Sequence, residues 1–193
     1  MTVFNTPFLS PILAFLSRLY LKMAGWKLQG QAPTCNKCVI IAAPHTSNWD
    51  FLLIITMAFA FKLRINWMGK DSLFKGPAGP IMRWMGGVAV DRSKSNNLVD
   101  AMVETYAQHD ELKLAIPPEG TRGKVRQWKS GFYHIAHNAG VPISPSFLDF
   151  GNKKGGFFPN FITTGNYAED LIKIQSLYKG MMGKNGPVSL DSE

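Results

Sequence analysis

The chain is 193 residues long and carries 21 Lys and Arg residues against 13 Asp and Glu residues, a formal net charge of +8 at pH 7. This length suits one domain with its own core, and the 46% hydrophobic content excludes an intrinsically disordered chain. The basic excess favours a partner rich in phosphate, a class that includes nucleic acid, anionic membranes and phosphorylated substrates. Composition does not choose among them.

Residues 1–24 are apolar, but they contain two prolines and the basic residues Arg18 and Lys22, so they are too short and too charged to span a bilayer. As a helix, this segment gathers its small and polar residues on one side, and large apolar residues fill the rest. The pattern is typical of a helix on an anionic membrane surface, and equally of a helix packed on the domain's own core. We predict the first of these, a helix that associates with the membrane surface.

After this segment, apolar strands alternate with helices. The sequence predicts strands at WKLQGQ, KCVIIAA, RINWMGK, VAVD and LKLAI, and helices over FLLIITMAFAF, 97–109 and 130–138. ISPSFLDF and FFPNFITT, joined by GNKKGG, have the pattern of a hairpin, and Asn166 with Glu169 predicts the start of a last helix that ends near Gly180. We therefore predict an α/β single domain with a central mixed, largely parallel β-sheet flanked by helices and an N-terminal amphipathic helix.

A histidine and an aspartate stand five residues apart in the loop APHTSNWDF, as His45 and Asp50. Imidazole is the side chain best suited to accept a proton near neutral pH. A carboxylate bonded to its second nitrogen would fix the tautomer and stabilise the charged ring. The spacing alone is not specific, because Asp50 could equally cap the helix that follows it.

The loop IPPEGTRGK follows a predicted strand and carries Glu119, Gly120, Thr121 and Arg122. Backbone N–H groups and a guanidinium in such a loop can bind a phosphate, and Glu119 would orient Arg122 or a substrate hydroxyl. The alternative is a solvated turn with a surface ion pair. Arg92, at the exit of the strand in GGVAVDRS, could supply a second phosphate contact or simply be an exposed arginine.

In this order, the segments resemble the PlsC-type 1-acylglycerol-3-phosphate acyltransferases. The family's H-x4-D block stands at 45–50, its G-x-x-x-I-D-R block at 86–92, its P-E-G-T-R block at 118–122 and its V-P-I-x-P block at 141–145. Ala89, Pro117 and Gly123 depart from the family pattern, and these departures bear on the acceptor rather than on the histidine–aspartate pair.

The resemblance implies a direct acyl transfer. His45, oriented by Asp50, would remove the proton of a hydroxyl on a lysophospholipid-like acceptor, with lysophosphatidic acid foremost, while that oxygen attacks an acyl thioester of coenzyme A or acyl carrier protein. Arg122, Glu119 and Arg92 would hold the acceptor, with Gly120 and Thr121 in the same loop and Lys70 as a further candidate. No bound cofactor is expected, and no metal, since the C-x-x-C at residues 35–38 lacks the second pair of a common zinc site.

The predicted organisation is an amphipathic membrane-associating helix over 1–24, an acyltransferase domain over 25–180 and a flexible tail over 181–193. We expect a peripheral or monotopic protein at the cytoplasmic face of the cell membrane. Alternatives are transfer to a lyso-aminolipid, lysophosphatidylethanolamine or glycerol phosphate, or a non-catalytic basic membrane-binding module. Nucleic acid is not expected, because the basic residues are scattered and no stacking motif accompanies them.

Overall fold

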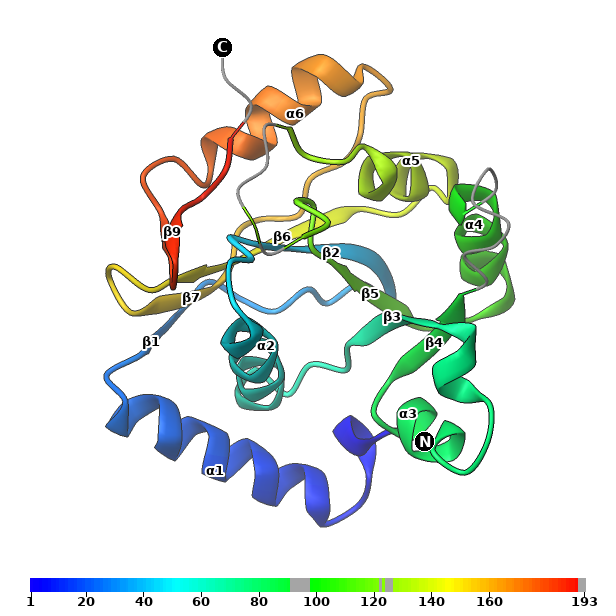
Figure 1. Cartoon of the computed structure of the whole chain (residues 1–193), viewed down its shortest axis with the longest axis vertical. Helices are drawn as coiled ribbons and strands as arrows, with labels where there is room; N and C mark the ends of the chain where they lie inside the picture. Colours follow the sequence, from blue (N-terminus) through cyan, green and yellow to red (C-terminus); the bar gives the residue numbers. More distant parts are fainter. Residues whose placement is uncertain (91–97, 122, 124–126, 191–193) are drawn as a thin grey trace.

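The computed structural model describes residues 1–90, 98–121, 123 and 127–190, and its centre is a β-sheet (Figure 1). In these residues the sheet has seven strands in the order β1-β7-β6-β2-β5-β3-β4. Each neighbouring pair is parallel except β6 and β7, which are antiparallel. The predicted α/β fold with a mixed, largely parallel sheet is confirmed. The strands are β1 (Lys27–Gln29), β2 (Lys37–Ala43), β3 (Asn66–Lys70), β4 (Gly87–Val90), β5 (Leu112–Ile116), β6 (Ile143–Asp149) and β7 (Lys154–Phe157).

Helices cover both faces of the sheet (Figure 1). One face carries α1 and α2, and the other carries α4, α5 and α6. The helices are η1 (Val3–Asn5), α1 (Leu9–Met23), α2 (Asn48–Ala60), η2 (Asp71–Phe74), α3 (Gly79–Trp84), α4 (Leu98–Gln108), α5 (Gly131–Asn138) and α6 (Tyr167–Ser176). Among the described residues, none of these helices combines the length and the apolar character that crossing a bilayer requires.

Strand β2 lies in the middle of the sheet and explains why the predicted run KCVIIAA is continuously apolar. Val39 and Ile41 belong to the larger hydrophobic cluster, which includes residues of α4, α5 and α6. Cys38 and Ile40 belong to the cluster on the opposite face, which includes residues of α2. Successive side chains of a strand point to opposite faces, so a strand covered on both sides must be apolar at every position.

Helix α1 packs on the domain with the side that carries Ala14 and Leu21. Ala14 and Leu21 are buried, and Arg18 Nε donates a hydrogen bond of 2.8 Å to the carbonyl oxygen of Ala60, at the end of α2. Six other large apolar residues of α1 are exposed: Ile12, Phe15, Leu16, Leu19, Tyr20 and Met23. The helix is therefore docked on the domain and still presents an apolar outer face.

Residues 181–190 contain regular structure that the sequence does not predict. Helix α6 ends at Ser176, before the expected Gly180. The tail expected to be flexible contains an antiparallel pair, β8 (Met182–Gly183) and β9 (Gly186–Pro187), followed by the buried Val188. We call residues 181–190 the C-terminal hairpin. Two-residue strands are too short to show a hydrophobic period, so this pairing could not be predicted from the sequence.

Candidate active site

The H-x4-D segment forms the turn between β2 and α2. Ser47 is the N-cap of α2, and its Oγ accepts the backbone N–H of Trp49 at 3.1 Å. Asp50 completes the cap, since its Oδ2 accepts the N–H groups of Thr46 and Ser47 at 2.7 and 2.8 Å. The capping role considered for Asp50 is therefore present. These two bonds hold the carboxylate in one orientation inside the turn.

The same carboxylate faces the ring of His45. The distance from His45 Nδ1 to Asp50 Oδ2 is 3.5 Å, with Asp50 fully buried and the His45 side chain 13% exposed. One carboxylate thus caps α2 and also faces the imidazole. Because Nδ1 faces Asp50, Nε2 lies on the opposite edge of the ring. This is the arrangement in which a carboxylate fixes the tautomer of a general base.

Glu119 is hydrogen-bonded to the backbone of His45. Its Oε2 accepts the backbone N–H of His45 at 2.9 Å, and the residue is only 1% exposed. Burial raises the pKa of Glu119 to about 6, although hydrogen bonds from the backbone N–H groups of His45 and Ser189 oppose this rise. The described contacts of Glu119 therefore support the turn that carries His45. Its expected contact with Arg122 stays a prediction, because Arg122 lies outside the described residues.

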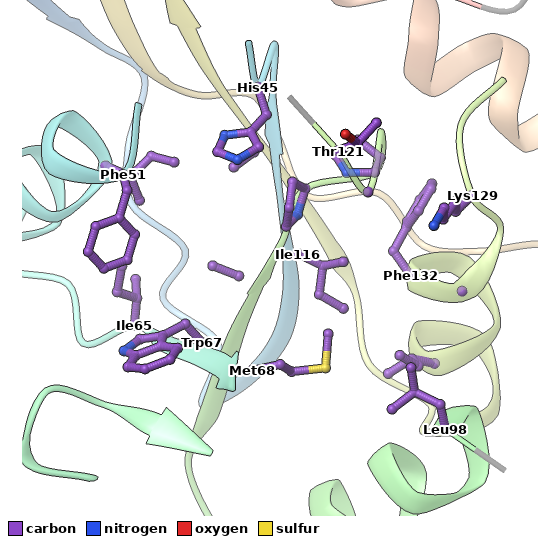
Figure 2. A pocket seen from close by; sticks show the side chains of 18 of the residues that line it. His45, Phe51, Ile65, Trp67, Met68, Leu98, Ile116, Thr121, Lys129 and Phe132 are labelled. Carbon is purple, nitrogen blue, oxygen red and sulfur yellow. The ribbon is translucent and has the colours of Figure 1, made fainter. Parts of the chain in front are cut away.

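A cavity of 690 Å³ opens beside His45 (Figure 2). Three polar residues, His45, Thr121 and Lys129, lie toward one end of it, and apolar side chains from β3, β5, α2, α4 and α5 line the remainder. The labelled members of the apolar part are Phe51, Ile65, Trp67, Met68, Leu98, Ile116 and Phe132. The site thus joins a proton acceptor to a space that suits a hydrocarbon chain.

The structure brings several of the predicted site residues together. One cavity is lined by His45, Gly120 and Thr121, and Glu119 accepts the backbone N–H of His45. Their proximity follows from the sheet, because β2 and β5 are parallel neighbours and the loops after them leave the same edge. Arg92 and Arg122 lie outside the described residues, as does the side chain of Lys70, so the predictions for these three remain predictions.

Two groups of lining residues were not among the predicted site residues. Lys129 lines the cavity and places an ammonium group near the backbone of Gly120, although its sequence position is explained equally well by a helix start. The apolar lining, which includes Trp67 and Phe132, could not be told from the core, since buried packing and an apolar cavity leave the same pattern. No group of three or more His, Cys, Asp or Glu side chains suited to a metal occurs in the described part of the chain.

The geometry combines an imidazole, faced by a buried carboxylate, with a cavity whose lining is mostly apolar. A family model described as Acyltransferase matches residues 27–149, and the chain belongs to this acyltransferase family. The family predicted from the sequence blocks is confirmed.

The chain is similar to two 1-acyl-sn-glycerol-3-phosphate acyltransferases. It is 31% identical over 144 residues to the enzyme of Haemophilus influenzae. The matched segment makes up 69% of this chain and 58% of the relative. It is 36% identical over 112 residues to the beta enzyme of Homo sapiens. This match makes up 53% of this chain and 40% of the relative. The chain therefore matches less than two thirds of the length of either relative.

A solved structure shares the fold. The 1-acyl-sn-glycerophosphate (LPA) acyltransferase PlsC from Thermotoga maritima superposes with a TM-score of 0.59 at 18% identity. The match covers 88% of this chain and 76% of that one. The shared fold therefore extends beyond the residues that the family model matches.

Proposed function

We propose that the protein is an O-acyltransferase that moves a fatty acyl group from an acyl thioester to a hydroxyl of a lysophospholipid, in phospholipid biosynthesis. One observation carries the proposal: His45, backed by the buried Asp50, lies at the polar end of a 690 Å³ cavity that is otherwise apolar. The names of the relatives support lysophosphatidic acid as the first acceptor to test.

In this mechanism, Nε2 of His45 takes the proton of the acceptor hydroxyl as its oxygen attacks the thioester carbonyl. The new C–O bond forms, the C–S bond breaks, and the departing thiolate takes the proton from the imidazolium. Asp50 stabilises that transient charge and holds the ring in place. General-base catalysis of this kind contributes roughly 10²–10⁴-fold to the rate. Coenzyme A and acyl carrier protein both present the required thioester, and no bound cofactor enters the reaction.

The acceptor's phosphate and its glycerol unit would lie at the polar end of the cavity. Lys129 and Thr121 line that end, and Arg122, two residues beyond Gly120, is the proposed guanidinium ligand. Lys70 and Arg92 are proposed to add positive charge to the same region. The apolar remainder of the cavity would take the fatty acyl chain.

We also propose that the protein works as a peripheral or monotopic enzyme at the cytoplasmic face of the cell membrane. The outer face of α1 exposes large apolar residues, and the chain carries an excess of positive charge. This combination favours adsorption to an anionic bilayer surface.

Vesicle binding tests the membrane proposal. Phe15→Glu, on the outer face of α1, should weaken cosedimentation with vesicles of phosphatidylglycerol and phosphatidylethanolamine by roughly tenfold, because a charge replaces an inserted aromatic ring. Ile172→Glu is the matched control, since Ile172 is equally exposed, at 69% against 66%, but lies on α6 across the sheet. Equal binding by both variants would contradict the role of α1.

The activity itself is tested with a panel of acceptors. Purified protein is incubated with labelled acyl-coenzyme A or acyl carrier protein and lysophosphatidic acid, lysophosphatidylethanolamine, a lyso-aminolipid or glycerol phosphate, and the products are separated. Labelled phosphatidic acid is the expected product. Labelling of another acceptor would retain the reaction and change the substrate. Lack of transfer with every donor and acceptor would favour a non-catalytic membrane-binding module.

A further inference from the structure

The C-terminal hairpin lies beside the ends of β6 and β7 (Figure 1). Phe150 N donates to the carbonyl of Met182 at 2.7 Å, and Met182 N donates to Asp149 Oδ1 at 3.3 Å. These bonds fix the base of the hairpin on the sheet. Its tip, Lys184 and Asn185, reaches the H-x4-D turn, where Lys184 Nζ lies 4.6 Å from the ring centroid of Trp49.

Asn185 holds the residue that follows the catalytic histidine. Its side-chain Nδ2 donates to the carbonyl oxygen of Thr46 at 2.8 Å, and its backbone N–H donates to Thr46 Oγ1 at 3.1 Å. The N–H of Thr46 in turn donates to Asp50 Oδ2 at 2.7 Å. All three polar groups of Thr46 are therefore bonded, two of them to one residue far along the chain.

The contact leaves no spare room. A Cβ atom added at Gly183 would lie 2.6 Å from both Cγ2 and Oγ1 of Thr46, a separation that real side chains do not adopt. Gly183 therefore lets the hairpin backbone come close enough for Asn185 to reach Thr46.

The far end of the hairpin reaches the other support of His45. Trp128 Nε1 donates to the carbonyl oxygen of Ser189 at 2.6 Å, and the Ser189 N–H donates a hydrogen bond to Glu119. Glu119 accepts the N–H of His45. The hairpin is thus connected to the backbone of His45 in two ways. Asn185 bonds Thr46, the next residue in the chain, and Ser189 bonds Glu119, which accepts the His45 N–H.

We propose that the C-terminal hairpin is a brace for the catalytic turn, and that Asn185 is a positioning residue that acts through Thr46 on the His45–Asp50 pair. The inference rests on the proposed acyl transfer. Asn185 does not line the cavity, so it touches no substrate there. Its bonds fix the peptide between His45 and Asp50, and a small misplacement of a catalytic group lowers the rate without weakening substrate binding.

Steady-state kinetics separate positioning from mere stabilisation of the tail. Asn185→Ala should lower kcat by roughly tenfold while the KM values for donor and acceptor change by less than about twofold. Asn185→Asp has the same shape but replaces the donor by a carboxylate that repels the Thr46 carbonyl, so it should be at least as impaired. Met182→Ala is the matched control on the same hairpin, because the Met182 side chain is exposed, and it should retain kcat within about twofold.

A second pair of variants tests the contact from its other side and covers the possibility that Asn185→Ala does not fold. Thr46→Val removes the hydroxyl that accepts the Asn185 N–H, whereas Thr46→Ser keeps it, so serine should retain more of kcat than valine. The brace is refuted if folded Asn185→Ala keeps kcat within twofold, if Asn185→Asp restores it, or if valine equals serine at position 46.

A spectroscopic measurement tests the brace independently of turnover. With histidine rings labelled in the intact chain, Asn185→Ala should shift the NMR signals of His45 and leave those of His109, His134 and His137 in place. Unmoved His45 signals would overturn the brace. An inactive wild-type protein whose His45 signals respond to Asn185→Ala would instead contradict the proposed function while supporting the brace.

Discussion

Replacing Glu119 by glutamine should change how the stability of the protein depends on pH. Glutamine has nearly the same shape as glutamate and keeps a side-chain oxygen that can accept the His45 N–H, the bond that Glu119 makes at 2.9 Å. It removes only the ionisable carboxyl group. The two proteins therefore differ chiefly in whether a buried group at this position takes up a proton.

The sign follows from the pKa. Burial raises the pKa of Glu119 from its ordinary value of 4.5 to about 6, so the folded protein holds this proton more tightly than the unfolded chain does. The stabilisation is complete at pH values below the pKa of Glu119 in the unfolded chain. It is lost as the pH rises through the pKa of Glu119 in the folded protein. A rise from 4.5 to about 6 corresponds to about 2 kcal/mol. The residue is 1% exposed, so solvent screening does not reduce this figure substantially.

Denaturant unfolding at a series of pH values between 4 and 7 gives the free energy of unfolding of both proteins. Titration of all other groups is common to them and cancels in the difference. The quantity to compare is the free energy of unfolding of the wild type minus that of Glu119→Gln. We expect this difference to fall by about 2 kcal/mol from the acidic to the neutral end of the series. A difference that stays constant, or that rises with pH, would show that Glu119 is not a buried carboxyl with a raised pKa.

Two further substitutions test the contacts around the turn. Asp50→Asn should lower kcat by at least about a hundredfold, because a neutral amide cannot stabilise the imidazolium. It should also lower the melting temperature, since an amide oxygen accepts the N–H groups of Thr46 and Ser47 less strongly than a carboxylate does. An unaltered kcat would separate Asp50 from catalysis. Trp128→Phe removes the 2.6 Å bond to the Ser189 carbonyl and should cost about 1 kcal/mol in denaturant unfolding, whereas an unchanged midpoint would make that bond irrelevant to stability.

The candidate site could be located in the sequence because its residues follow predicted strands. The sequence showed apolar runs that end before His45 and before the Glu-Gly-Thr-Arg loop. It did not show that β2 and β5 are neighbours, which is what brings the two loops together. Strand order depends on contacts between distant segments, and in this chain the family's ordered blocks supplied what local patterns could not.

Asp50 and α1 show where sequence patterns left alternatives open. Capping and orienting a histidine were considered as separate roles for Asp50, yet one carboxylate oxygen can face two N–H groups and an imidazole together. For α1, the pattern separated a small, polar side from an apolar side but did not say which side docks. In the structure, Ala14 and Leu21 are buried and Arg18 bonds the carbonyl of Ala60, so this side of α1 faces the domain.

The C-terminal hairpin could not be predicted from the sequence, for a different reason. Its strands are two residues long, and its main contact joins Asn185 to Thr46, which are 139 positions apart. Neither residue type marks such a bond, since Asn is common in turns and Thr in loops. Only the folded structure shows that the end of the chain reaches the catalytic turn.

The central claim is that His45 accepts a proton during acyl transfer, and the turnover of His45→Ala tests it most directly. His45→Gln, which keeps more of the ring's volume, is measured beside it, and His109→Ala serves as the control because His109 is exposed and bonds only the carbonyl of Thr105 in the described structure. We expect both His45 variants to fold and to lose at least about a hundredfold in kcat, with His109→Ala close to wild type. Folded His45 variants that transfer acyl groups at near-wild-type rates would remove the imidazole from the mechanism.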